Sequence, residues 1–130
     1  MTTRLSARIA AAVLATGAAT AIALGGAAAA QAGPPSSTVL TPGNGVCSAN
    51  QYASYQVRAD GYATNQGAKF KLLRNGVVIQ NTPTRVNAWS GELRSAYGTF
   101  PGPGYYSVCA QNTGTANTTV TLQIRSDNEF

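Results

Sequence analysis

The sequence has no histidine, and its 130 residues include only four acidic side chains and two cysteines. Histidine is the usual general base near neutral pH and the usual proton carrier of hydrolytic triads, so its absence argues against both kinds of catalysis. Two cysteines without a histidine are too few to complete a tetrahedral metal site. The sequence also has no P-loop, dinucleotide-binding or calcium-loop pattern. These absences favour a protein that is not an enzyme and that uses neither a cofactor nor a metal.

The scarcity of carboxylates leaves one pair to test for glycoside hydrolysis, Asp60 with Glu92. Two catalytic carboxyl groups have to lie about 5 to 9.5 Å apart in a cleft. Asp60 stands in an Asp-Gly pair and Glu92 follows a Ser-Gly pair, and both pairs are typical of turns. We therefore expect both carboxylates to be solvated turn residues, and an enzyme would require a cleft that contains the two of them.

Residues 1–32 have the layout of a secretory signal peptide. A short basic start is followed by an apolar run at 9–24 and by a small-residue cleavage site of the A-x-A type at 30–32. The apolar run is shorter than the roughly 20 residues of a spanning helix, which favours cleavage over an uncleaved anchor. The sequence therefore predicts a secreted protein, extracellular or associated with the cell surface, with no membrane span after cleavage.

The mature chain, 33–130, has the length of a single domain. It carries seven basic and four acidic side chains, a net charge of +3, and this modest charge on an exported protein argues against nucleic acid as a partner. A domain of this size has a thin stability margin, and cysteines are oxidised outside the cell. We therefore expect a disulfide between Cys47 and Cys109.

Apolar and polar residues alternate with a period of two along most of the mature chain, as in antiparallel strands with one face on the core. The clearest run is TVTLQI, in which Val120, Leu122 and Ile124 alternate with polar residues. We expect strands at 38–40, 53–59, 68–74, 77–80, 92–100, 105–111 and 118–125. The prediction is an all-β protein, a single antiparallel β-sandwich of about seven strands at 38–126, with a flexible segment at 33–37 and a polar tail at 127–130.

Turn signals separate these strands. Asn75-Gly76 is the strongest, because both residues tolerate the positive φ angles of a two-residue type I′ hairpin. Asp60-Gly61, Ser90-Gly91 and the Gly/Pro cluster at 101–104 indicate further corners.

The stretch GPGYYSVCAQN, 102–112, has a Gly/Pro corner followed by alternating Tyr106, Val108, Ala110 and Asn112. With the following TTVTLQI it resembles the last two strands of small secreted bacterial immunoglobulin-like or fibronectin-III-like sandwiches, and it is similar to the closing hairpin of pre-peptidase C-terminal domains. The resemblance covers about the second half of the mature chain and implies an immunoglobulin-like sandwich. It also implies a corner-tyrosine role for Tyr106, with a packed ring and a hydroxyl bonded to nearby backbone.

One feature departs from antibody-type domains, where the disulfide crosses the core. If Tyr106, Val108 and Ala110 face the core, Cys109 faces the other way. Either a bulge resets the alternation, or the disulfide ties the N-terminal part of the domain, through Cys47, to the outer face of a sheet. We favour the surface tether.

Aromatic residues supply the first candidate binding site. Trp89 stands alone among polar residues just before an expected turn, and an exposed indole on a loop stacks on sugars or anchors a protein partner. Tyr62, Tyr97 and Tyr105 are candidates to extend such a platform. The alternative is that Trp89 packs over one end of the core, as large aromatic side chains in small domains usually do.

Basic residues supply the second candidate. If the strands at 53–59 and 68–74 are neighbours, Arg58 lies beside Lys69 or Lys71, and Arg74 continues the row. Such a stripe fits an anionic surface such as a wall polymer or an acidic glycan. The alternative is that the lysines only protect the sheet from unwanted pairing.

The sequence thus predicts a secreted, non-catalytic binding module, and the leading partner is a cell-wall or other extracellular polysaccharide. A second hypothesis is a small inhibitor or effector that presents the loop at 81–91 to an extracellular protein. A third is an accessory subunit that pairs through an open sheet edge. The oligomeric state stays undetermined at this stage.

Overall fold

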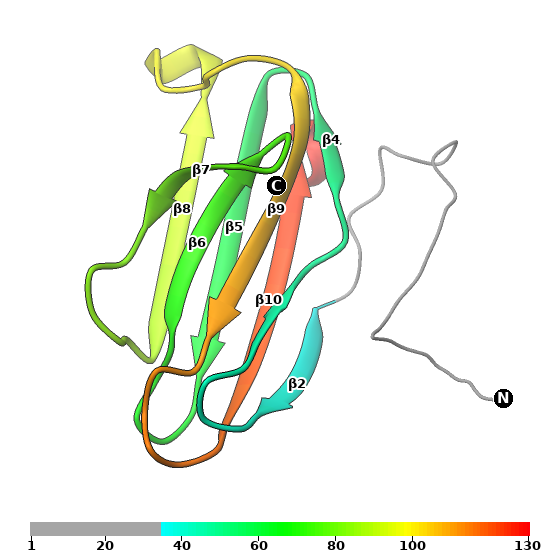
Figure 1. Ribbon diagram of the computed structural model, residues 1–130. Helices are drawn as coiled ribbons and strands as arrows, with labels where there is room; N and C mark the ends of the chain where they lie inside the picture. Colours follow the sequence, from blue (N-terminus) through cyan, green and yellow to red (C-terminus); the bar gives the residue numbers. More distant parts are fainter. Residues whose placement is uncertain (1–34) are drawn as a thin grey trace, which may run out of the picture.

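The computed structural model describes residues 35–130, which form two antiparallel sheets packed face to face, with β6, β7 and β9 lying in front of β5, β8 and β10 in Figure 1. The four-stranded sheet has the order β2-β10-β5-β8, and the five-stranded sheet has the order β3-β9-β6-β7, with β4 also paired to β9. The strands are β2 (Ser36–Leu40), β3 (Gly45–Cys47), β4 (Gln51–Ala53), β5 (Gln56–Ala63), β6 (Lys69–Arg74), β7 (Val77–Asn81), β8 (Ala88–Arg94), β9 (Gly104–Gln111) and β10 (Thr118–Ser126). The predicted all-β sandwich is confirmed, and the predicted signal peptide lies outside the described residues.

The core lies between the two sheets and follows the predicted alternation. Phe70 and Leu72 of β6 and every second residue of β9 and β10 are buried, and their outward neighbours, except Ser107, are more exposed. The largest side chains buried in it are Tyr106, Phe70, Leu72, Leu122 and Val57. Burial of one such apolar side chain contributes about 1.5–3 kcal/mol, so this cluster holds the sheets together.

The Asn75-Gly76 hairpin is confirmed. Arg74 pairs with Val77 across a two-residue loop, and Asn75 and Gly76 have φ angles of 51° and 82°. The corner role expected of Tyr106 is confirmed as well. Its ring is fully buried against Phe100, and its hydroxyl donates a 2.6 Å hydrogen bond to the carbonyl of Gly102.

Two predicted corners are wrong, because Asp60-Gly61 lies within β5 and Ser90-Gly91 lies within β8. Gly61 makes room for an aromatic ring, since a Cβ atom there would stand 2.5 Å from the ring of Phe70. Gly91 likewise lies under Trp89 and the side chain of Gln80. Glycine inside a strand often marks such a close approach rather than a turn. The strand expected at 92–100 is therefore at 88–94 and is followed by the 3-10 turn Ser95–Tyr97.

Both ends of the domain are more ordered than expected. Ser36 and Ser37, placed in the predicted flexible segment 33–37, belong to β2 and pair with Leu122 and Thr121 of β10. The predicted polar tail 127–130 contains a 3-10 turn, Asp127–Glu129. The Asp127 carboxylate accepts backbone N–H groups of the bend between β4 and β5, so these residues close the sandwich rather than trail from it.

Candidate functional site

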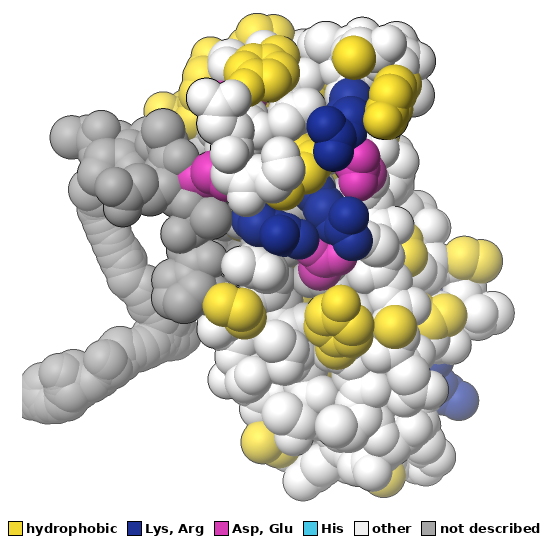
Figure 2. All heavy atoms as spheres, turned by 180° about the vertical axis from the view of Figure 1, so that it is seen from behind, with side chains coloured by type: hydrophobic (Ala, Val, Ile, Leu, Met, Phe, Trp, Pro, Cys, Tyr) yellow, Lys and Arg dark blue, Asp and Glu magenta, His cyan; other side chains and the backbone are white. Residues whose placement is uncertain are grey.

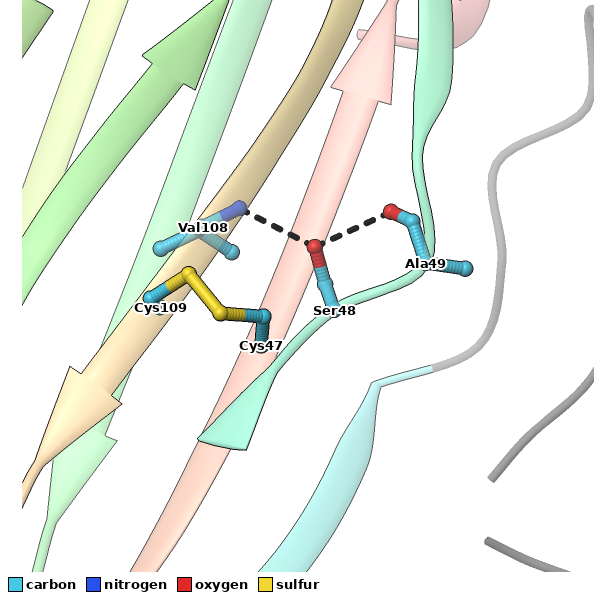
Figure 3. Close-up of a disulfide and its surroundings, with 5 residues drawn as sticks. All are labelled: Cys47, Ser48, Ala49, Val108 and Cys109. Carbon is cyan, nitrogen blue, oxygen red and sulfur yellow. Dashed lines mark hydrogen bonds between the residues drawn. A yellow bond between two sulfur atoms is a disulfide. The ribbon is translucent and has the colours of Figure 1, made fainter. Parts of the chain in front are cut away.

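The disulfide lies on the outer face of the five-stranded sheet. Cys47 of β3 and Cys109 of β9 are directly opposite partners, with Cα atoms 3.9 Å apart (Figure 3). Beyond Cys47 the pairing continues, because the backbone N–H of Val108 donates to the Ser48 hydroxyl at 3.0 Å, and this hydroxyl donates to the Ala49 carbonyl (Figure 3). The predicted surface tether is confirmed, and the bond joins two strands of one sheet instead of crossing the core.

A shallow groove of about 410 Å³ surrounds this disulfide. Its floor includes the two cysteines and its apolar wall includes Leu73 and Val78, while Lys69 and Lys71 stand along β6 beside them. The two lysines and the disulfide are each predicted features of the sequence, and the fold brings them together in this groove. The signal was available in the alternation of KFKL, which places both lysines on the face opposite Phe70 and Leu72.

Within residues 35–130, no acidic side chain forms an ion pair with either groove lysine. The ion pairs among the described residues join arginines of β5, β8 and β10 to Asp60 or Glu92, and neither lysine takes part in one. The groove therefore presents two positive charges next to apolar surface.

The predicted row of Arg58 with Lys69, Lys71 and Arg74 is wrong as a continuous stripe. Arg58 lies on β5, in the four-stranded sheet, whereas the other three lie on β6, in the five-stranded sheet. The prediction fails because β5 and β6, although consecutive in the chain, belong to different sheets. Arg74 also differs from the two lysines, because its guanidinium donates hydrogen bonds to the backbone carbonyls of Gly102 and Pro103.

Arg58 belongs to a charged cluster on the outer face of the four-stranded sheet, where Figure 2 shows basic and acidic side chains gathered together. It donates to both Asp60 and Glu92 at 3.2 Å. Arg125 donates to Asp60 at 2.8 Å, and Arg94 pairs with Glu92. The three arginines of this cluster are all paired with its two carboxylates, which leaves a net charge of only +1, so it is a poorer docking site for a charged ligand than a group of unpaired cations.

The carboxylate pair considered for catalysis, Asp60 with Glu92, lies in this cluster on strand positions rather than in turns. Burial alone would raise the pKa of Asp60, but hydrogen bonds from Ser90 and Arg125 and the charge of Arg58 outweigh it and hold the pKa below its ordinary value. Arg94 lowers the pKa of Glu92 through a hydrogen bond and its charge. Both groups are held as carboxylates by arginines, which suits structural ion pairs and not a general acid at neutral pH.

Trp89 does not lie on an exposed loop. It occupies β8 opposite Gly61, is half-buried, and its ring stacks on Phe70 with centroids 6.1 Å apart and planes 5° apart. Its indole therefore packs against the core, which is the alternative that the sequence left open.

The three tyrosines do not form a platform with Trp89. Tyr62 projects from the outer face of the four-stranded sheet, whereas Trp89 is on its inner face. Tyr97 lies in the turn after β8, where its ring faces the guanidinium of Arg94. Tyr105 is on the five-stranded sheet, 52% exposed, and forms an edge-to-face pair with Tyr52 of β4 at 5.2 Å. Tyr52 was missed by sequence reasoning because β4 was not recognised as a separate strand.

Strand β7 is the outer edge of the five-stranded sheet, next to the groove. Within 35–130 it pairs only with β6. Val77, Val78 and Ile79 expose 65%, 43% and 36% of their surface, and the strand carries no charge. A register shift opposite Leu72 and Leu73 makes Ile79 an extra residue, a β-bulge.

The loop proposed for protein contacts, 81–91, is held against the rest of the domain by backbone and side-chain hydrogen bonds, and its last residues belong to β8. Val86 forms an isolated bridge with Ala68, the Thr82 hydroxyl accepts the backbone N–H of Phe70, and Arg85 donates to the Thr113 carbonyl. Pro83, Thr84 and Arg85 remain exposed.

No protein-family model and no curated protein matches this chain. In the described part of the chain, His, Cys, Asp and Glu nowhere gather in a group of three or more that would hold a metal ion. Within the same residues, no helix has the length and apolar character needed to cross a membrane.

Proposed function

We propose that the protein is a secreted, non-catalytic binding module whose partner is an extracellular protein, contacted at the β7 edge of the five-stranded sheet. The observation that carries the proposal is the open, apolar and uncharged strand β7. Sheet edges are normally guarded by charged residues or proline, and β7 has neither, although it has a bulge. An exposed edge of this kind pairs readily with a strand of another protein.

Three further features support a binding role. The two candidate catalytic carboxylates are neutralised by arginines. The groove beside β7 has a floor formed by a disulfide, which is a fixed surface. The signal-like segment 1–32 supports export, where such a disulfide persists.

A polysaccharide is the second candidate partner, and Tyr52 with Tyr105 is the observation that favours it. The two rings are neighbours on the same face as the groove, and exposed aromatic rings stack on sugars. Their edge-to-face arrangement offers single ring faces and not a flat platform, so we rank this candidate below a protein partner.

The experiment compares residues 33–130 with two matched variants, Val77→Glu in β7 and Val39→Glu in β2. Val77 and Val39 are 65% and 62% exposed on edge strands of opposite sheets, so the two changes are alike in chemistry and exposure. Each immobilised protein is incubated with the extracellular proteins of the source culture, and in a separate arm each soluble protein is mixed with insoluble cell wall.

We expect one or more extracellular proteins to be retained by the wild type and by Val39→Glu and lost by Val77→Glu. Retention that is equal in all three proteins would contradict a β7 contact. Depletion by cell wall that disappears in Tyr105→Ala would instead support the polysaccharide candidate.

A further inference from the structure

The chemistry of the partner segment follows from the residues around β7, provided that the proposed protein contact at β7 holds. A strand added to β7 lies two strand spacings from β6, about 9.5 Å. The combined lengths of a lysine and a glutamate side chain span that distance. Side chains of the added strand that face the groove side therefore lie within reach of Lys71, which is the outward residue of β6 opposite Asn81 of β7.

Charge decides which side chains fit there. Lys69 and Lys71 have no ion pair among the described residues, whereas Arg58, Arg94 and Arg125 on the other sheet each have at least one. Arg74 is occupied by backbone carbonyls. The positive charge that is left for a partner on this face thus belongs to the two lysines, and an acidic segment complements it.

Spacing sets the order of the acidic residues. The two lysines are two residues apart on one strand, about 6.6 Å, which is also the separation of alternate side chains in any extended segment. Leu73 continues the same outward row and forms the apolar wall of the groove with Val78. A segment that runs parallel to β6 therefore matches the row with acidic, acidic and apolar residues at alternate positions.

We propose that β7 accepts an extended acidic segment of a partner protein by β-sheet addition, with carboxylates at two alternate positions meeting Lys69 and Lys71 and an apolar side chain meeting Leu73 and Val78. In this arrangement the groove recognises the acidic side chains of the added strand, and the edge of β7 forms the backbone hydrogen bonds with it.

The test uses residues 33–130 and a fluorescently labelled peptide with the sequence Glu-Thr-Glu-Thr-Val-Thr-Val, blocked at both ends. One control peptide has lysine in place of both glutamates, a second has the reversed order, and a third has proline in place of the central threonine. The protein variants are Lys71→Glu and Arg85→Glu, which change the net charge equally, and Arg85 lies outside the groove. Binding is measured by fluorescence anisotropy at low and high salt.

We expect the acidic peptide to bind, Lys71→Glu to weaken it at least tenfold, and Arg85→Glu to change it less than twofold. The lysine and proline peptides should bind at least tenfold more weakly, and salt should reduce the affinity of the acidic peptide. The reversed peptide tests the direction of the added strand. Weaker binding of the reversed peptide than of the acidic peptide supports a strand that runs parallel to β6.

Equal binding of the acidic and lysine peptides would contradict the proposal that the partner segment is acidic. The proposed protein contact at β7 would still hold, provided that Val77→Glu loses its extracellular partner. Failure of every peptide would also overturn this inference, while the proposed function falls only if Val77→Glu keeps its partner. A dimer in sedimentation that Val77→Glu abolishes would show that β7 is occupied by a second copy, which overturns the inference as well.

Discussion

At the scale of single residues, Gly61 is a position where the backbone of one sheet closely approaches a core ring of the other sheet. A Cβ atom at this position would lie 2.5 Å from two carbon atoms of the Phe70 ring, which itself stacks on Trp89. We predict that Gly61→Ala lowers the free energy of unfolding by about 1–3 kcal/mol, the usual cost of an overpacked core. Urea unfolding followed by tryptophan fluorescence measures the change.

Gly91→Ala is the matched control, because Gly91 lies on the neighbouring strand β8. Its nearest atom is the side-chain oxygen of Gln80 at 2.6 Å, the end of a flexible side chain that is able to move. We expect a smaller loss than at Gly61. Equal stability of Gly61→Ala and the wild type would contradict the ring contact.

The second prediction at this scale concerns Asp60 and pH. Its pKa is lowered in the folded protein from an ordinary value of 3.8, so its ion pairs stabilise the fold above that pH. The contribution is lost as the pH falls from about 3.8 through the lower folded value. We predict that Asp60→Asn is less stable than the wild type at pH 7 and that the difference shrinks toward pH 2.

Thermal unfolding of both proteins across this pH range measures that difference. Asp127, whose pKa is also lowered, is present in both proteins and cancels in the comparison. A difference in stability that stays constant from pH 7 to pH 2 would show that Asp60 contributes by packing and not by charge.

At the scale of elements, we expect the disulfide to stabilise the fold, and we expect the same fold to form without it. Cys47 and Cys109 are 62 positions apart, and closing a loop of that length restricts the unfolded chain by about 4 kcal/mol in the chain-entropy model. We predict that a double change to serine lowers the free energy of unfolding by roughly that amount. Because β9 also pairs with β6 along six residue pairs, the sheet should persist, and far-ultraviolet circular dichroism checks this. Complete unfolding in the absence of denaturant, or an unchanged urea midpoint, would contradict the prediction.

Alternation predicted most strands because it depends on only one residue in two being buried. It located β6, β9 and β10 to within about a residue, and Asn75-Gly76 fixed the β6–β7 hairpin. It failed for β3 and β4, whose three residues each are too few to show a period. It failed for β8 because Gly91 was interpreted as a corner. In both cases the deciding contact is strand pairing with residues distant in sequence, with β9 for β3 and β4 and with β5 for β8.

At the scale of the whole molecule, local patterns do not say which sheet a strand joins. The polar faces of β5 and β6 were both recognised, but their assignment to opposite sheets separates Arg58 from Lys69 and Lys71. The same assignment turns Trp89 inward, onto Phe70, and leaves Tyr62 and Tyr105 on different faces. The candidate site therefore moved from an aromatic platform to a basic groove, although both lysines and both cysteines had been singled out.

The packing of β2 in the whole molecule also determines how many N-terminal residues can be removed without loss of stability. Strand β2 starts at Ser36, so the expected cleavage before residue 33 leaves it intact. β2 pairs with β10 over five residues, buries Leu40, and places the Leu40 carbonyl 2.9 Å from the buried side-chain nitrogen of Asn112, which donates to it.

We predict that a chain starting at residue 35 is as stable as one starting at 33. A chain starting at 41 should lose at least about 2 kcal/mol, because burial of one leucine alone is worth about 1.5–3 kcal/mol and the Asn112 amide loses an acceptor. Urea midpoints of the three chains measure this. Equal midpoints for the chains starting at 35 and 41 would mean that β2 is dispensable and that β10 is stable as the edge of its sheet, whereas a loss already at 35 would place stabilising contacts before β2.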